Sequence, residues 1–186
     1  MDRLKVVWIT LIVAPLVFDR APDTSVATPT ESAPTNLVLG SEARTLGQEA
    51  VAAHLDALNP TLSDRQVERI SRAVLKYSAK YELDPALVLG VITQESAARL
   101  WVRSPKGAIG LMQVTPYMMG TLPVAGNLTT IESNIEAGCI ILSDNIRRLG
   151  EQKGILAYFW GNEIRGIRYW QRVEQARASI RRQAES

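Results

Sequence analysis

Glu95 is the side chain of this sequence whose surroundings best suit proton transfer. It follows an apolar run, Leu87 to Ile92, near the end of a predicted helix. Apolar surroundings disfavour a charged carboxylate, and the C-terminal end of a helix dipole does the same, so both should raise its pKa. A carboxylic acid that stays protonated near neutral pH can serve as a general acid. Periodicity alone also allows an ordinary solvated glutamate, or one paired with Arg99 four residues later.

The helix that carries Glu95 has a recognisable start. Asp84 suits the N-cap position and Pro85 suits the first helical position, where a missing N–H is not needed. Helical spacing then places Val91 and Ile92 one turn before Glu95, on the same face. The spacing therefore predicts that the carboxylate continues a buried apolar stripe.

A loop with two glycines follows this helix. Gly107 and Gly110 allow the backbone to bend sharply and to approach a ligand closely. Gln113 offers a donor and an acceptor to hydroxyl or acetamido groups, and Ser104 and Tyr158 each bring a hydroxyl. A turn role for Ser104 and a core position for Tyr158 fit their sequence positions about equally well.

Several short motifs around these residues occur together. The chain resembles the soluble lytic transglycosylase family, of the lysozyme-like superfamily, in these segments: Glu95-Ser96, Ser104-Pro105, Gly107-Ala108, Gly110-Leu111-Met112-Gln113, Asn134-Ile135-Glu136-Ala137-Gly138 and, in part, Ala157-Tyr158-Phe159-Trp160-Gly161. The resemblance covers residues 83–173, about half of the chain. It implies a mainly α, lysozyme-like domain in which Glu95 is catalytic. The substrate-binding residues that it implies are Ser104, Met112, Gln113 and Tyr158.

The resemblance also implies a reaction on the glycan strands of peptidoglycan. Glu95 would protonate the β-1,4 oxygen between N-acetylmuramic acid and N-acetylglucosamine, and the muramoyl C6 hydroxyl would then close an anhydro ring. Most glycosidases use two carboxylates, whereas this reaction needs one. The other acids considered are expected to be solvated or capping residues of a later helix: Glu132, Glu136 and Asp144. The alternatives are a lysozyme-type muramidase that uses water, and an inactive module that binds peptidoglycan or acts as a scaffold.

Some positions depart from the family pattern where the groove lining is expected. Phe159 stands where asparagine is usual, Thr115 where methionine is usual, and Ile141 where tyrosine is frequent. The changes at Phe159 and Thr115 favour the inactive module. Trp160 either provides a surface for stacking on sugar or packs in the core.

The N-terminal part of the chain differs in composition from the rest. Residues 1–20 place two basic side chains before an apolar run, which suits a signal peptide or a membrane anchor. Residues 21–40 are rich in proline, threonine, serine and alanine and predict a flexible linker. The transglycosylase domain is expected at 41–186. These features predict export to the periplasm or cell envelope, with residues 4–18 as a candidate anchor in the inner membrane.

The domain has helical patterns and few strand patterns. Besides the helix that begins at Asp84, the predicted helices are 42–58, 63–81 with a capping box formed by Ser63 and Gln66, 131–149 closed by Gly150, and 153–175. The arginines near the C-terminus are predicted to be solvated: Arg177, Arg181 and Arg182.

No sequence pattern for a metal, nucleotide or other cofactor is found. Cys139 is the single cysteine, so it is expected to pack as a small apolar residue, and the single histidine, His54, lies outside every matched motif. A net charge of +2 and a pI of about 8.8 are too weakly basic to indicate nucleic-acid binding. The expected partners are peptidoglycan strands, a membrane through the N-terminal segment, and a secretion, conjugation or phage assembly.

Overall fold

The structure is a computed structural model that describes residues 46–185. This part contains six α-helices and one short 3-10 helix: α1 (Gln48–Leu58), α2 (Asp64–Lys80), α3 (Pro85–Ser96), η1 (Pro116–Gly120), α4 (Ile131–Leu149), α5 (Glu151–Trp160) and α6 (Arg168–Ala184). Its extended pairing consists of two isolated bridges, from Ile109 to Arg103 and to Val114. The prediction of a mainly α domain is confirmed. The predicted leader and linker lie outside the described residues.

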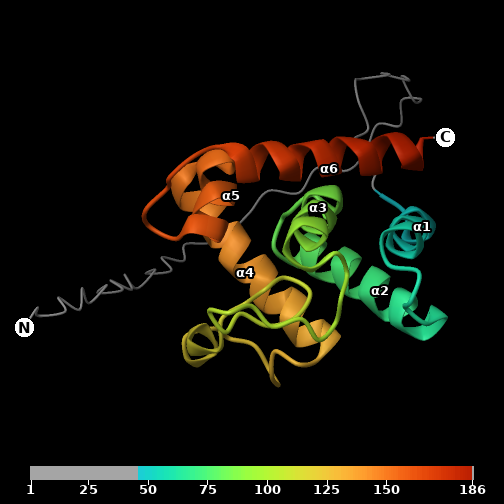
Figure 1. The fold of residues 1–186 in the computed structure, drawn as a ribbon, viewed down its shortest axis with the longest axis horizontal. Helices are drawn as coiled ribbons and strands as arrows, with labels where there is room; N and C mark the ends of the chain where they lie inside the picture. The colour runs from blue at the N-terminus through green and yellow to red at the C-terminus, as the bar shows by residue number, and fades with distance from the viewer. Residues whose placement is uncertain (1–45, 186) are drawn as a thin grey trace, which may run out of the picture. The chain divides into compact units, whose positions relative to one another are not determined.

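Helix α3 is buried on all sides. Every residue from Ala86 to Ile92 is buried, and α2 and α6 both pack against the helix. Figure 1 shows α6 passing over α3, with α5 at one end of α6. Gly90 permits the close approach, because a Cβ there would lie 3.1 Å from the backbone oxygen of Val173. The sequence predicted one buried apolar stripe on this helix, whereas the structure buries the helix on all faces. A helix enclosed by its neighbours is apolar all round.

The start of α3 is held by a cap and by two arginines. The Oδ1 atom of Asp84 accepts a hydrogen bond from the N–H of Ala86 at 3.0 Å, as the sequence predicted. Its Oδ2 atom accepts from Arg177 at 2.5 Å and from Arg181 at 2.6 Å. The prediction of solvated arginines is wrong for Arg177, whose side chain is 12% exposed, whereas Arg181 remains 55% exposed while it pairs with Asp84. Residues four apart on α6 face the same carboxylate.

Helix α4 begins and ends at the predicted residues, and α2 lies within one residue of its predicted bounds at each end. The N–H of Ser63 donates to Oε1 of Gln66 at 2.9 Å, one half of the predicted capping box. Helix α4 ends before Gly150, which has a positive φ of 78°. The two helices pack against each other and form one side of the core.

The acidic residues of α4 are paired with cations. The ion pairs are Arg69 with Glu132 at 2.7 Å, Lys80 with Glu136 at 2.6 Å, and Arg147 and Arg148 with Asp144 at 2.8 and 2.7 Å. The predicted solvated role is compatible with Glu132 and Asp144, which are 43% and 41% exposed, and is wrong for Glu136, which is 12% exposed. Pairs of this kind, near the surface, contribute little to stability.

The predicted helix 153–175 is in fact two helices. Helix α5 ends at Trp160, and Gly161 has a positive φ of 71° that other residues rarely adopt. The chain then turns through residues 161–167 before α6 begins. This break allows α6 to return across α3.

Three further observations concern the described residues. Cys139 is fully buried in the core, as predicted, and burial raises the pKa of its thiol. None of the helices in residues 46–185 combines the length and the apolar character that a bilayer span requires. The same part of the chain holds no cluster of three histidine, cysteine or acidic side chains suited to a metal ion.

Candidate active site

Glu95 lies in the last turn of α3 and is half-buried. The hydroxyl of Tyr169 donates a hydrogen bond to its Oε1 atom at 2.5 Å. Burial raises the pKa of Glu95 above its usual range, while the hydrogen bond from Tyr169 and the positive charge of Arg172 act in the opposite direction. The direction predicted from the sequence is confirmed, and burial is its main cause.

The alternative partner for Glu95 is not used. The side chain of Arg99 turns back, and its Nε donates to the backbone oxygen of Ser96 at 2.9 Å. Arg172 of α6 is the cation that influences Glu95, and its Nε donates to Oε1 of Gln94 at 3.0 Å. The acid therefore has a cation nearby but no direct ion pair with the described residues.

Tyr169 is a site residue that the sequence analysis missed. It is buried at the start of α6, where burial and the charge of Glu95 both raise the pKa of its hydroxyl. The available signal was an apolar stripe formed by Tyr169, Val173 and Ile180 on a helix that is otherwise rich in arginine. That stripe indicates a face turned to the core. It does not indicate which residue, 74 positions earlier, the hydroxyl meets.

Ser104 closes the turn at the start of the glycine-containing loop. Its Oγ accepts from the N–H of Ala108 at 3.0 Å, and its own N–H donates to the oxygen of Ala108 at 2.9 Å. Gly107 has a positive φ of 85° inside this turn. The turn role considered for Ser104 is the one seen, and its role toward a substrate stays a prediction.

Gln113 supports the same loop from its other end. Its Nε2 atom donates to the backbone oxygens of Val102 at 3.1 Å and Gly110 at 3.0 Å. The residue has a φ of 50°, an uncommon conformation outside glycine. The donor group of its amide is thus engaged with the loop, and its predicted contact with substrate is untested.

Asn134 of α4 binds the loop through its side-chain amide. Its Oδ1 accepts from the N–H of Met112 at 2.8 Å, and its Nδ2 donates to the oxygens of Ile109 and Leu128 at 2.8 and 3.0 Å. A Cβ at Gly110 would lie 2.5 Å from Nδ2 of Asn134, and the φ of Gly110 is 77°. Two motifs that are separate in the sequence therefore form one unit, with the asparagine of the later motif holding the glycine loop of the earlier one.

Met112 and Tyr158 join the loop to α4 and α5. The side chain of Met112 is fully buried against α4, where a Cβ at Gly138 would lie 2.4 Å from its sulfur. The hydroxyl of Tyr158 donates to the backbone oxygen of Met112 at 2.7 Å. Burial, followed by the charge of Glu95, raises the pKa of Tyr158 well above its usual range. Tyr158 is thus in the electrostatic neighbourhood of the acid, whereas the side chain of Met112 belongs to the core and its predicted contact with substrate is untested.

Aromatic rings continue outward from Tyr169. The ring of Phe159 stacks on that of Tyr169, with centroids 4.5 Å apart and planes inclined by 15°. Trp160 meets Phe159 edge to face at 5.0 Å and 85°. Phe159 is 47% exposed and Trp160 is 37% exposed, so the core position considered for Trp160 is not the one seen.

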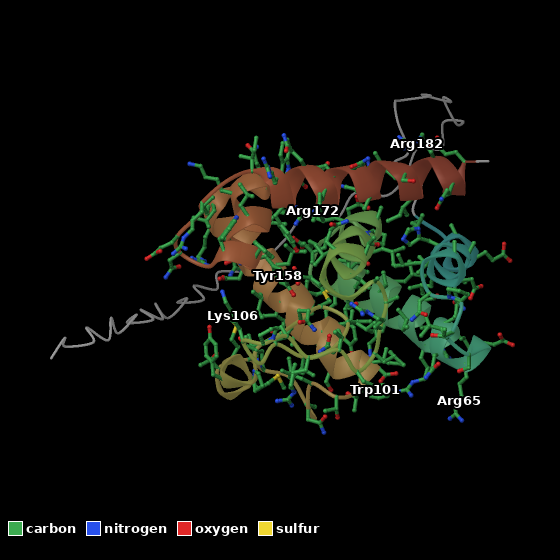
Figure 2. The ribbon with its side chains drawn as sticks, viewed as in Figure 1. Arg65, Trp101, Lys106, Tyr158, Arg172 and Arg182 are labelled. Atoms are coloured by element: carbon green, nitrogen blue, oxygen red, sulfur yellow. The ribbon has the colours of Figure 1, made fainter. Side chains whose placement is uncertain are left out.

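A separate open groove lies on the loop that follows α3. It encloses about 390 Å³, and its lining residues come from three segments: Asn59, Thr61, Leu62, Gln66, Arg99, Leu100, Trp101 and Val102. None of the predicted site residues lines this groove. Figure 2 shows Trp101 on the side of the domain away from α6, and Tyr158 and Arg172 toward α5 and α6.

Comparison with known proteins gives one family and several relatives. Residues 72–179 match the family described as the transglycosylase SLT domain. The chain is 40% identical over 85 residues to a transglycosylase of Enterobacteria phage PRD1, a match that covers 45% of this chain and 32% of the phage protein. The chain thus spans about a third of that relative.

Solved structures of lytic transglycosylases are also similar. The 70 kDa soluble lytic transglycosylase of Escherichia coli is 21% identical, with a TM-score of 0.46, over 73% of this chain and 27% of that one. An inactive mutant of lytic transglycosylase Slt from Pseudomonas aeruginosa is 20% identical, with a TM-score of 0.43, over 59% of this chain and 22% of that one.

Proposed function

The chain belongs to the transglycosylase SLT domain family, because the match to that family over residues 72–179 covers more than half of the chain. We propose that the protein is a lytic transglycosylase of peptidoglycan. Glu95 is the catalytic acid. The observation that carries this assignment is a half-buried carboxylate whose pKa is raised and whose direct partner is the neutral hydroxyl of Tyr169. Such a group stays protonated to a higher pH than an exposed glutamate, as a general acid requires.

One carboxylate performs both proton transfers in this proposal. Glu95 donates its proton to the glycosidic oxygen between N-acetylmuramic acid and N-acetylglucosamine, and the bond from that oxygen to C1 of the muramoyl residue breaks. The acetamido oxygen of the substrate stabilises the positive charge that develops at C1. The C6 hydroxyl then bonds to C1 and returns its proton to Glu95, so an anhydromuramoyl end forms and no water is consumed. The acids of α4 take no part, since each is bound to lysine or arginine.

The Glu95→Gln variant tests the assignment of the acid. The amide keeps the size of the side chain but has no proton to transfer, so release of glycan fragments from purified sacculi should fall by roughly 100- to 10,000-fold. The matched control is Glu132→Gln. It removes a carboxylate of α4 that is paired with Arg69 of α2, and it should leave activity unchanged. Retained activity in Glu95→Gln, with a normal melting curve by circular dichroism, would contradict the proposal.

The chemical form of the product ends tests the type of reaction. Mass spectrometry of the released muropeptides should find anhydromuramoyl ends. Reducing ends that carry oxygen from labelled water would instead identify a muramidase. Binding to sacculi without release of any fragment would identify the inactive module, which the replacement of asparagine by Phe159 had favoured.

Export of the chain is part of the proposal, because peptidoglycan lies outside the cytoplasmic membrane. Residues 1–20 are proposed as the signal or anchor. Cell fractionation should find the full chain in the envelope and a variant that begins at residue 21 in the cytoplasm. Full-length chain in the cytoplasmic fraction would contradict this assignment. The phage, secretion or conjugation assembly proposed as partner can be sought by crosslinking in the same cells.

A further inference from the structure

The aromatic rings of Phe159 and Trp160 are exposed at the end of α5, next to the candidate acid. Phe159 touches Tyr169, and Tyr169 touches Glu95, so Phe159 is separated from the acid by one ring. Its 47% exposure is high for a phenylalanine that already stacks on a buried tyrosine. An exposed pair of large apolar rings beside a polar reacting group is typical of a binding surface.

The geometry of the pair limits what it can bind. One face of Phe159 is covered by Tyr169, because the two planes are inclined by only 15°. Phe159 is still 47% exposed, so the contact with Tyr169 leaves part of its ring open to solvent. The ring of Trp160 stands at 85° to that of Phe159, with the centroids 5.0 Å apart. The result is a corner with one flat floor and one perpendicular side. A pyranose ring presents a flat face of C–H groups of suitable size for such a floor, and the electron-rich face of an aromatic ring attracts them.

We propose that Phe159 and Trp160 form a stacking site for a sugar ring of the glycan strand, next to the bond that Glu95 cleaves. This inference rests on the proposed function for the identity of the polymer. Phenylalanine has no hydrogen-bonding group, so binding here depends on ring stacking where an asparagine would offer polar contacts. The bracing by Tyr169 holds Phe159 in place before the substrate arrives, which reduces the entropy lost on binding.

The substitution Phe159→Leu provides the sharpest test. Leucine keeps apolar bulk against Tyr169 but has no aromatic face, so KM for soluble uncrosslinked glycan strands should rise by roughly 2- to 10-fold with kcat unchanged. Phe159→Tyr keeps the face and should leave KM unchanged. Trp160→Ala removes the side wall and should raise KM by a smaller factor. Melting curves should match the wild type, because both rings are partly exposed.

Trp101→Ala is the matched control, because Trp101 is 70% exposed on the groove away from α6. It should leave KM unchanged. An unchanged KM in Phe159→Leu, or an equal rise in Trp101→Ala, overturns the proposal. A fall in kcat with a shifted pH profile and a constant KM also overturns it, because Phe159 would then act only by bracing Tyr169.

A binding measurement separates this inference from the proposed function. Each substitution is combined with Glu95→Gln, and binding of soluble glycan strands is followed by tryptophan fluorescence. If the wild type cleaves but Phe159→Leu alters neither KM nor binding, the stacking site is wrong and the function stands. If the wild type does not cleave but Phe159→Leu weakens binding, the function is wrong and the stacking site stands. Absence of both cleavage and binding overturns the two together.

Discussion

The two ends of α3 each carry a carboxylate that α6 contacts, but the contacts differ in charge. At the first end, Asp84 is bound by Arg177 and Arg181. At the other end, Glu95 is bound by the neutral hydroxyl of Tyr169. One helix pair thus provides an ion pair at one end and a hydrogen bond from an uncharged donor at the other. The identity of the partner decides which carboxylate serves the structure and which can exchange a proton.

The helix itself strengthens this contrast. Asp84 is the N-cap, where the exposed N–H groups favour a negative charge, whereas Glu95 lies in the last turn, where the carbonyl groups oppose one. Arg177 is also bound to Glu151 and Glu174, so the first end is a network of charges. Its side chain is only 12% exposed. We therefore expect changes at Asp84 to affect stability and changes around Glu95 to affect the pH dependence of the reaction.

Replacing Asp84 should have the largest effect on stability. Asp84→Ala removes a cap and leaves the nearly buried Arg177 with one carboxylate fewer, so the free energy of unfolding should fall by about 2 to 3 kcal/mol. Asp84→Asn keeps the cap and should lose less. Urea unfolding followed by circular dichroism measures both. Glu163→Ala, which breaks the exposed pair with Arg165, is the control and should change nothing measurable. Equal urea midpoints for Asp84→Ala and the wild type would contradict the claim that Asp84 stabilises the fold.

Local signals in the sequence were enough to predict both ends of α3. Asp84 and Pro85 form a cap that depends only on neighbouring residues, and the last-turn position of Glu95 follows from helical spacing. The capping box of α2 and the end of α4 at Gly150 are local in the same sense. These predictions depend on a few adjacent residues and were confirmed, whereas the start of the first helix, predicted at 42, lies at Gln48 in the described residues.

The partners that α6 supplies could not be predicted in this way. Arg177 meets Asp84 across 93 positions, and Tyr169 meets Glu95 across 74. Both contacts require the break at Gly161. The sequence predicted one continuous helix over 153–175, because the amino acids on either side of this glycine favour a helix. The role of Asn134 as a support of the loop is also long-range, since it depends on how α4 approaches residues 109–112.

The Tyr169→Phe variant tests the uncharged partner at the other end of the helix. Its hydroxyl stabilises the ionised form of Glu95, so removing it should raise the pKa of Glu95 further. In the proposed reaction the acid acts in its protonated form, so the fall in kcat/KM at high pH should move to higher pH. The ring that stacks on Phe159 is kept in this variant. A pH profile that stays fixed, or moves to lower pH, would show that the hydroxyl does not control the acid.

The pH dependence of stability should have opposite signs for two glutamates. Burial raises the pKa of Glu95, so its favourable contribution is present below the pKa of the unfolded chain and is lost as pH rises through the folded value. Glu95→Gln should therefore gain stability relative to the wild type as pH rises. The hydrogen bond from Arg69 lowers the pKa of Glu132, so its favourable contribution is present above the pKa of the unfolded chain and is lost as pH falls through the folded value. Glu132→Gln should therefore lose stability relative to the wild type as pH rises through this lower, more acidic range. Urea unfolding at a series of pH values measures both, and parallel curves for the two variants would contradict the assigned environments.

Arg172 should have the smallest effect, because its charge acts on Glu95 without a direct ion pair and contributes less than the hydrogen bond from Tyr169. Arg172→Gln should move the high-pH limb of kcat/KM in the same direction as Tyr169→Phe, but by less. Salt screens charges that interact without direct contact. Added salt should therefore move the high-pH limb of kcat/KM in the wild type and should leave that limb nearly fixed in Arg172→Gln. Arg172→Lys keeps the charge and should behave as the wild type. A shift in Arg172→Gln larger than that in Tyr169→Phe would mean that charge, and not the neutral hydroxyl, sets the protonation of the acid.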